Sequence, residues 1–376
     1  MKTILYWGPF IDNKIATVKA IYNSAIGANR YLTKYHAKII NTIGEWDFKI
    51  DNNNKKYFLN TNLNLLNYLP KYGFFKSRFS YLIIFFISFF KIKKIIEKQK
   101  PDFFIAHLIV SVPLLLFKFY KFDTKLILRI SGKPKFNLFR KSLWKFCSNS
   151  VDKVFCPTTE TREILIKNNI YSKEKIFVLN DPVINLKNFR KWKNENNFDK
   201  KFEKNNIILA GRLTNQKNFN LIIDAYTKNE SLKKFKIFIF GAGENEQKLR
   251  KKILINNLDS RIFIMGHKKN IFKYMIKSKV FILTSLWEDP GFVLIEAAMS
   301  NLAIIASNCP SGPEEIISKE EFGGYLFNNN EVNDLNKKII QFINDDEKEV
   351  FKKKCFIKKN IKKFTTFNHV KLLEKL

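Results

Sequence analysis

Residues 280–299 read Val280-Phe-Ile-Leu-Thr-Ser-Leu-Trp-Glu-Asp-Pro-Gly-Phe-Val-Leu-Ile-Glu-Ala-Ala-Met299. The run 280–283 is short and apolar, which is typical of a buried strand. Asp289-Pro290-Gly291 predicts a turn, and the apolar stretch after it predicts a helix. A strand, a loop and a helix in this order form the repeating unit of a parallel α/β sheet, which binds ligands just past the carboxyl ends of its strands.

The same alternation extends along the whole chain. In the first half we expect strands at Thr3–Trp7, Lys38–Thr42, Phe103–Ala106, Lys125–Ile130, Lys153–Cys156 and Ile176–Leu179, and helices at Ile15–Leu32, Phe79–Lys98, Leu138–Ser148 and Thr159–Lys167. In the second half we expect strands at Asn206–Ala210, Lys236–Phe240, Arg261–Met265, Val280–Leu283, Ala303–Ala306 and Gly324–Phe327. The helices there are expected near Lys217–Thr227, Glu244–Ile255, Ile271–Lys277, Gly291–Ser300, Gly312–Ser318 and Val332–Ile343, with a last one at Val370–Leu376.

The two series of elements predict two domains, which suits a chain of 376 residues. We expect an N-terminal Rossmann-like domain at residues 1–187, a polar linker at 188–204 and a second Rossmann-like domain at 205–358. A helix at 359–376 would pack back on the first domain. The fold class is therefore α/β, with two doubly wound domains that face a central cleft.

The chain is strongly basic, with 67 Lys and Arg against 34 Asp and Glu, a formal net charge of +33. Such an excess attracts nucleic acid, anionic lipid or phosphorylated substrates. Genome composition is a second explanation that stays open. Lys, Asn, Ile and Phe all look over-used and are all encoded by A- and T-rich codons, so the Lys content could be high without selection for a partner. The basic residues are spread along the chain rather than clustered, which argues against a nucleic-acid partner.

Cysteine and histidine spacing gives no sign of disulfides or metal. The four cysteines, Cys147, Cys156, Cys309 and Cys355, form no C-x-x-C pair, so we expect reduced thiols in a cytoplasmic protein. The four histidines lie far apart and no D-x-D motif is present, so we predict that no metal is required. The longest apolar stretch, Phe79–Phe90, is shorter than the roughly 20 residues of a membrane-spanning helix, and the N-terminal run is too short for a signal peptide.

Two carboxylates frame the loop after the strand Val280–Leu283. Glu296 lies among apolar residues, where a carboxylate without partners would cost several kcal/mol, so the hydroxyls of a ribose would suit it. The alternative is a structural Glu that contacts neighbouring backbone. Glu288, in the loop, could accept hydrogen bonds from sugar hydroxyls or be an ordinary solvated acid.

A basic segment follows the strand Asn206–Ala210. Arg212 and Lys217 would bind a pyrophosphate, the Arg through its fork and the Lys as a point charge, and Gly211 would let a ligand approach the backbone. Solvated basic residues are the alternative in so basic a chain. Gly241-Ala-Gly243 follows another strand, but lacks the third Gly of a dinucleotide fingerprint.

Two residues at strand ends of the first half are further candidates. Gly8 ends the first strand and would face a ligand bound across the cleft, unless it is an ordinary turn residue. His107 ends the strand Phe103–Ala106 and would lie on the acceptor side, unless it is a structural histidine.

Together these segments resemble glycosyltransferase family 4, the retaining enzymes of GT-B fold that include builders of bacterial surface polysaccharides. The resemblance rests on Gly211-Arg212…Lys217, on Gly241-x-Gly243 and on the E-x7-E pair Glu288…Glu296, and it is clear over residues 206–327. It implies that Arg212, Lys217 and Glu288 serve catalysis, and that Glu296 binds the donor's ribose. The other donor-binding residues that it implies are Gly8, Gly211, Gly241, Gly243, Gly291 and Phe292.

The resemblance also implies a reaction. A sugar would move from a nucleoside-diphosphate sugar to a glycan or lipid-linked acceptor, with the two cations stabilising the leaving diphosphate. The first loop reads Trp7-Gly8-Pro9-Phe10 where relatives often carry a Gly pair, and Arg129-Ile-Ser-Gly132 stands where many carry a His before the Gly. A sugar-nucleotide epimerase, a basic nucleic-acid-binding protein and a non-catalytic scaffold remain as alternatives.

One basic stretch suggests where the protein acts. Residues 74–98 combine aromatic and aliphatic side chains with Lys76, Arg78, Lys91, Lys93 and Lys94. We interpret Phe79–Phe90 as a core helix and the flanking charges as contacts to an anionic membrane, on the inner face of the cytoplasmic membrane.

Overall fold

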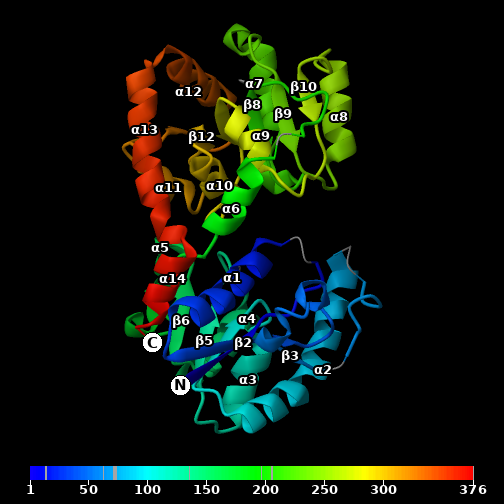
Figure 1. Ribbon diagram of the computed structural model, residues 1–376, viewed down its shortest axis with the longest axis vertical. Coiled ribbons are helices and arrows are strands. Elements are labelled where there is room, and N and C mark those ends of the chain that lie inside the picture. The colour runs from blue at the N-terminus through cyan, green and yellow to red at the C-terminus, as the bar shows by residue number, and fades with distance from the viewer. Residues whose placement is uncertain are drawn as a thin grey trace. The chain divides into compact units, whose positions relative to one another are not determined.

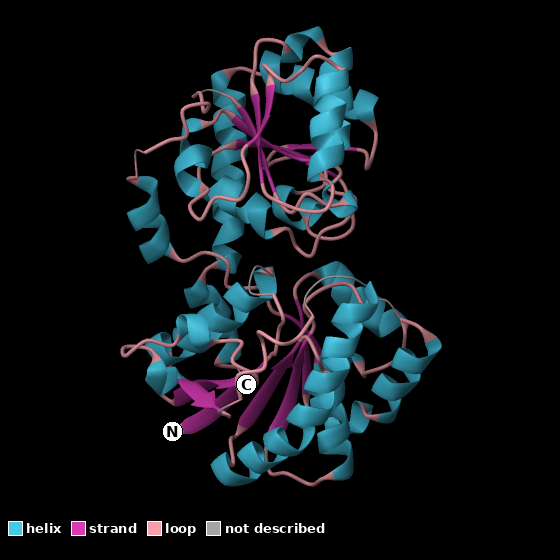
Figure 2. Ribbon diagram, turned by 90° about the vertical axis from the view of Figure 1, so that its right-hand side faces the viewer, coloured by secondary structure: helices cyan, strands magenta, loops and turns pink. Residues whose placement is uncertain are grey.

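The computed structural model describes residues 1–12, 15–61, 63–70, 74–134, 136–195, 197–204 and 206–375. The chain divides into two compact units, the first made of Met1–Val183 with Thr366–Leu376 and the second of Ile184–Thr365 (Figure 1). Each unit is an open parallel sheet with helices on both of its faces (Figure 2). The α/β fold class with two doubly wound units is thereby confirmed.

The first unit contains a seven-stranded sheet in the order β3-β2-β1-β4-β5-β6-β7, with every pairing parallel. Its strands are β1 (Lys2–Trp7), β2 (Tyr35–Asn41), β3 (Phe58–Asn60), β4 (Phe103–His107), β5 (Lys125–Arg129), β6 (Lys153–Cys156) and β7 (Ile176–Val178). The central strands read as apolar runs because both faces of the sheet are covered, and Ile4, Leu5 and Trp7 are fully buried.

In the described part of this unit, six α-helices cover the sheet. They are α1 (Ala16–Tyr31), α2 (Phe74–Gln99), α3 (Ser111–Phe119), α4 (Leu138–Phe146), α5 (Thr159–Lys167) and α14 (Thr366–Leu373). The helices α2 to α5 share one hydrophobic core on one face, because each is part of a right-handed crossover in the same direction along the sheet. The helices α1 and α14 share the core of the other face.

The second unit contains a six-stranded parallel sheet in the order β10-β9-β8-β11-β12-β13. Its strands are β8 (Ile207–Ala210), β9 (Ile237–Phe240), β10 (Ile262–Ile264), β11 (Val280–Leu283), β12 (Ala303–Ser307) and β13 (Tyr325–Phe327). Its helices are α6 (Leu186–Lys193), α7 (Asn220–Lys228), α8 (Glu246–Ile255), α9 (Phe272–Lys277), α10 (Phe292–Met299), α11 (Pro313–Ile317), α12 (Val332–Asn344) and α13 (Glu347–Asn360). The helices α7, α8 and α12 contribute to the main core of this unit.

All twelve expected strands are present, displaced by at most a few residues, and the differences lie at the edges. The strand β3 has only three residues, too few for periodicity to reveal. The helix α3 escapes prediction because Pro113 suggests a break, although proline is tolerated in a first turn. Residues 186–193, which overlap the expected linker, form α6 in the second unit, and α13 is a further helix that the alternation did not indicate.

Candidate functional site

The loops after β8 and β11 meet at the carboxyl edge of the second sheet. These two strands are neighbours, and from β8 the strand order runs through β9 and β10 on one side and through β11, β12 and β13 on the other. Such a reversal is the topological switch point, where loops diverge and leave room for a ligand. The segments containing Arg212 and Glu288 follow these two strands, so the fold brings together two regions more than 70 residues apart in the sequence.

A buried ion pair joins the two loops. Lys217 Nζ contacts Glu288 Oε1, and the two side chains are 13% and 5% exposed. The hydroxyl of Ser285 donates to the same carboxylate oxygen at 2.5 Å. Glu288 is therefore not the solvated loop acid of the alternative interpretation. Lys217 lies on a 3-10 turn at Asn215–Lys217 rather than in the next helix, which begins at Asn220.

Hydrogen bonds to backbone carbonyls hold this pair in a fixed frame. Leu286 N–H donates to Gln216 O at 2.8 Å, and Gln216 Nε2 donates to Trp287 O at 2.8 Å. A third loop, after β12, is tied to the second, because Glu288 N–H donates to Pro310 O at 2.7 Å and Ser311 N–H donates back to Glu288 O at 2.9 Å. Three neighbouring loops thus form one connected edge, and Ser285 and Ser311 are members that sequence reasoning missed.

The two candidate cations have different surroundings. Arg212 is exposed, and its closest hydrogen-bond acceptor is Gln216 Oε1, 3.5 Å from Nη2, which is at the limit of a hydrogen bond. Its guanidinium remains accessible to an anion. The charge of Lys217 is already balanced by Glu288. A diphosphate could therefore bind Arg212 directly, whereas binding Lys217 would compete with the carboxylate of Glu288.

The glycines of this edge allow backbone segments to approach each other. A Cβ on Gly241 would lie 1.8 Å from Gly211 O, and a Cβ on Gly243 would lie 2.5 Å from Leu213 O. A Cβ on Gly211 would lie 3.2 Å from the Lys217 side chain. The loop after β9 therefore supports the loop after β8 directly, a packing reason for these glycines that does not require a ligand.

The helix α10 begins at this edge and presents one accessible stripe. Its N-cap Gly291 has φ +91°, a conformation that favours glycine, and a Cβ there would lie 3.3 Å from the Glu288 side chain. Along the helix, residues 294, 295, 297 and 298 are buried, whereas Phe292, Val293 and Glu296 are partly exposed. Helical periodicity thus places Glu296 on the same face as Phe292 in the first turn of α10, about 6 Å further along the axis.

The third loop adds a buried thiol. Burial, and next the charge of Glu288, raises the pKa of Cys309 to about 12, so this cysteine stays a neutral thiol. A Cβ on Gly312, which has φ +119°, would lie 2.3 Å from Pro290 O. The loop after β12 therefore packs closely against the Asp289-Pro290-Gly291 turn.

In the first unit, Gly8 and His107 pack against each other. A Cβ on Gly8 would lie 2.9 Å from His107 Cβ and 2.6 Å from Ile21 Cδ1, so glycine is needed for packing here. His107 is 3% exposed, and neither ring nitrogen has a hydrogen-bond partner among the described residues. Burial, and next the charge of Arg129, holds the pKa of His107 well below its ordinary value, so the ring is neutral.

A directed hydrogen-bond chain crosses the same region. His369 Nδ1 lies 2.8 Å from Asn180 O, and because a carbonyl only accepts, this nitrogen carries the hydrogen. His369 Nε2 then accepts from Ser24 Oγ at 2.7 Å, and the Tyr6 hydroxyl donates to Ser24 at 2.9 Å. The chain joins β1, α1 and α14, and burial lowers the pKa of His369 to about 3.

Arg129 is the second polar feature that sequence reasoning did not place. Its Nη2 lies 2.6 Å from Asp181 Oδ1, and both side chains are almost fully buried. Its Nη1 donates to the carbonyls of Ile130 and Phe155. Arg129 is thus committed to holding the ends of β5 and β6 together and to Asp181.

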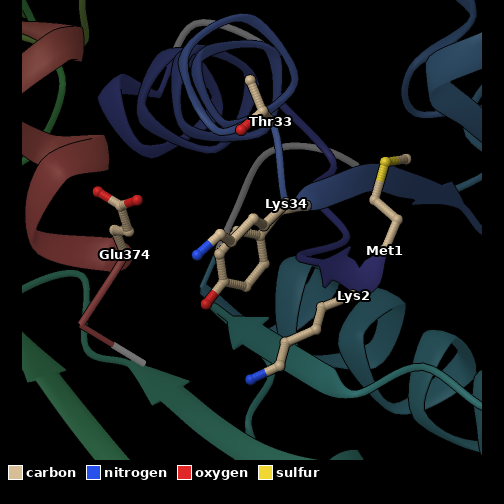
Figure 3. Close-up of a pocket in the computed structure, with 6 residues that line it drawn as sticks. Met1, Lys2, Thr33, Lys34 and Glu374 are labelled. Carbon is tan, nitrogen blue, oxygen red and sulfur yellow. The ribbon is translucent and has the colours of Figure 1, made fainter.

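A pocket of about 580 Å³ lies at the opposite, amino edge of the first sheet, where β1 and β2 begin (Figure 3). It is lined by Met1, Lys2, Thr33, Lys34, Tyr35 and Glu374. Open α/β sheets bind their ligands at the carboxyl edge, so we assign this pocket no part in the site. Within the described ranges, no group of three or more His, Cys, Asp or Glu is arranged to hold a metal ion.

Comparison with known proteins shows what the second unit and the fold resemble. Residues 189–362, nearly the whole second unit, match the family model described as glycosyl transferases group 1. An uncharacterised glycosyltransferase of Methanocaldococcus jannaschii is 32% identical over 259 residues, which are 61% of each chain. The UDP-Gal:alpha-D-GlcNAc-diphosphoundecaprenol alpha-1,3-galactosyltransferase of Escherichia coli is 26% identical over 310 residues, 77% of each chain.

The chain spans only about three fifths of the length of the M. jannaschii protein. Among solved structures, Anabaena HepE in complex with UDP superposes with a TM-score of 0.73 at 14% identity, covering 100% of this chain and 99% of that one. That likeness shows the fold, which is GT-B. Residues 189–362 of the second unit are similar to the glycosyl transferases group 1 family.

Proposed function

We propose that this protein is a glycosyltransferase that moves a sugar from a nucleoside-diphosphate sugar to a glycan or lipid-linked acceptor in the synthesis of a cell-surface polysaccharide. One observation carries the proposal. The loops after β8 and β11 are locked together at the switch point by Lys217 and Glu288, beside the exposed Arg212 and the start of α10. Cations and the N-terminus of a helix both favour a bound diphosphate, and this edge carries Arg212, Lys217 and the start of α10.

The donor would be held in three parts. Arg212 would bind the diphosphate through its fork, with Lys217 behind it as a second positive charge. The carboxylate of Glu296, on the accessible stripe of α10, would accept hydrogen bonds from the ribose hydroxyls. The turn around Glu288, Gly291 and Phe292 would bind the donor sugar. In the first unit, His107 would reach an acceptor only if the packing around it opened.

The chemistry expected of this edge is electrostatic. When the bond between the sugar and the diphosphate breaks, negative charge grows on the leaving oxygen, and a fixed guanidinium beside it stabilises that charge. We propose that the reaction retains the anomeric configuration, as the family resemblance implies, and that it requires no metal.

The acceptor and the location are part of the same proposal. The E. coli relative is named for a sugar attached to diphosphoundecaprenol, which is a lipid carrier. A lipid-linked acceptor would place this protein on the inner face of the cytoplasmic membrane, where its net charge of +33 would attract anionic lipid. Within the residues that the structure describes, no helix has the length and hydropathy required to cross a bilayer.

A thermal-shift screen of nucleoside diphosphates and nucleotide sugars tests donor binding. A ligand that binds only the folded protein stabilises it by about 2.7 kcal/mol at 100 times its dissociation constant. We expect a concentration-dependent rise in melting temperature for the parent, and a much smaller rise for Arg212→Ala and Glu296→Ala. Arg250→Ala, which removes an exposed arginine of α8 paired with Glu246, is the matched control and should respond like the parent.

The alternative functions predict different outcomes. An epimerase would convert the donor with no acceptor present, whereas a transferase needs the acceptor. A nucleic-acid-binding protein would bind duplex or RNA tightly, with strong salt dependence. A scaffold would show no shift with any nucleotide sugar, and that result would refute the proposed function.

A further inference from the structure

The helix α2 has one buried face and one exposed apolar face. Its buried line, Ser80, Ile84, Ser88, Ile92 and Ile96, recurs every four residues, and its later members pack into the core of the first unit. The opposite line consists of Phe79, Leu82, Phe86 and Phe90, which are 57–70% exposed. Phe79–Phe90 is therefore a core helix, as expected, through one of its faces, and its other face is exposed.

This exposed line is unusual for a water-soluble surface. Single exposed apolar side chains are common, but three phenylalanines and a leucine within three turns form a stripe about 16 Å long. Large exposed apolar patches mark surfaces that contact a membrane or another protein. The core of the first unit is complete without them, because the helix already packs through its other face.

The neighbouring helices continue the same outer surface. Phe89 of α2 contacts Tyr120, at the end of α3, with ring centroids 6.5 Å apart. Lys118 of α3 lies 4.5 Å from the ring centroid of Phe146 in α4. These contacts make α2, α3 and α4 one continuous layer on a single face of the sheet, and α2 and α3 lie side by side in Figure 1.

The helix α4 adds a second apolar pair to this layer. Leu138 and Phe139, its first two residues, are 87% and 78% exposed, while Trp144 anchors the helix in the core. Lys141 and Lys145 are exposed on the same short helix. Both α2 and α4 thus carry exposed apolar side chains near basic ones.

Charge identifies what this layer would contact. The sequences of α2, α3 and α4 contain ten Lys or Arg and a single acid, Glu97, which is paired with Lys93 at 3.2 Å. A second copy of the same face would bring these basic residues against each other. An anionic lipid surface accepts both the phenylalanines and the lysines, because the rings enter the interface while the ammonium groups stay among the head groups.

We propose that the outer face of the α2–α3–α4 layer is the membrane-docking surface, and that its phenylalanines insert into the interface of an anionic bilayer. The inference rests on the proposed function only for the reason why a membrane is needed. Attachment then has an apolar part as well as an electrostatic one. Salt weakens only the electrostatic part, so a portion of the bound protein should resist high salt.

Sedimentation with vesicles of phosphatidylglycerol and phosphatidylcholine tests this division. We expect the parent to pellet at 0.1 M NaCl and to remain partly bound at 0.5 M NaCl. The double variant Phe86→Ser/Phe90→Ser should lose the salt-resistant fraction, with a partition coefficient lower by about 10- to 100-fold. Lys141→Gln/Lys145→Gln should weaken binding at low salt and leave the salt-resistant fraction in place.

The matched control is Leu254→Ser/Ile255→Ser, which removes two comparably exposed apolar residues from α8 of the second unit. It should bind vesicles like the parent. Complete release of the parent at 0.5 M NaCl, or unchanged binding of the phenylalanine variant, would overturn the proposal. So would a parent that is a dimer in solution and becomes a monomer in that variant. Donor-induced thermal shifts, measured without vesicles, test the proposed function separately.

Discussion

Removing the ammonium of Lys217 would leave a buried carboxylate without its counter-charge. In Lys217→Met, Glu288 keeps its position at 5% exposure and its hydrogen bond from Ser285, but loses the cation. Breaking a buried pair from one side costs about 3–5 kcal/mol, and the 13% exposure of Lys217 moves our expectation to about 2–4 kcal/mol. In a unit of this size each kcal/mol lowers the melting temperature by about 2–4 °C.

A double-mutant cycle shows whether the stability lost in Lys217→Met comes from its interaction with Glu288. Glu288→Gln in the Lys217→Met background removes the stranded charge, so the double variant should regain stability. We expect a coupling energy of about 1–3 kcal/mol from urea denaturation of the four proteins. Each measurement is made without ligand, so that donor binding does not enter.

The pair Lys338–Glu321 is the matched control, because it joins a Lys and a Glu of the same unit at 2.5 Å with both side chains more than 20% exposed. Lys338→Met should cost about 0–1 kcal/mol. Equal costs for Lys217→Met and Lys338→Met, or a double variant whose loss equals the sum of the single losses, would refute the argument that this pair holds the two loops together.

Three further predictions concern other parts of the molecule. The buried His369 is neutral in the folded protein, where its pKa is about 3. Its contribution to the free energy of unfolding is therefore complete above pH 6.5 and falls by about 1.4 kcal/mol per pH unit as the pH drops. The variant His369→Gln should remove that slope in urea titrations between pH 4 and 5.5. Gly241→Ala should abolish folding of the second unit or cost more than about 3 kcal/mol, whereas Gly266→Ala, with open space around its Cβ but φ +68°, should cost about 1 kcal/mol by circular dichroism melts; similar costs would contradict the packing argument. Sugar transfer should be unchanged by EDTA, and a loss that Mg²⁺ or Mn²⁺ restores would show that a metal is required.

The sequence predicted the strands well because buried parallel strands are short apolar runs between turn residues, as Val280–Leu283 illustrates. It could not predict the partner of Lys217, because Glu288 lies 71 residues away and only the strand order brings the two together. The same reason hid the chain from Tyr6 through Ser24 to His369, which spans the first and last helices of the first unit.

Composition also left the two faces of α2 unresolved. Aromatic and aliphatic residues occupy Phe79–Phe90 except at Ser80 and Ser88, so the sequence marks no charged, solvent-facing side of this helix. The structure buries one line of residues and exposes the other, because only one layer of sheet lies beneath the helix. The glycines were also ambiguous in the sequence. Gly8 and Gly241 suggest contact with a ligand, but close packing against neighbouring side chains or backbone already requires glycine at both positions.

The return of the chain to the first unit has a consequence for how the protein is made. Gly27 of α1 leaves room for Thr366 and Val370, so α14 seats closely on a helix that left the ribosome more than 300 residues earlier. Until α14 is made, α1 covers the core on that side of the sheet without it, and the second unit, which is contiguous, can finish folding first. The first unit therefore completes its core only after the second unit has been synthesised.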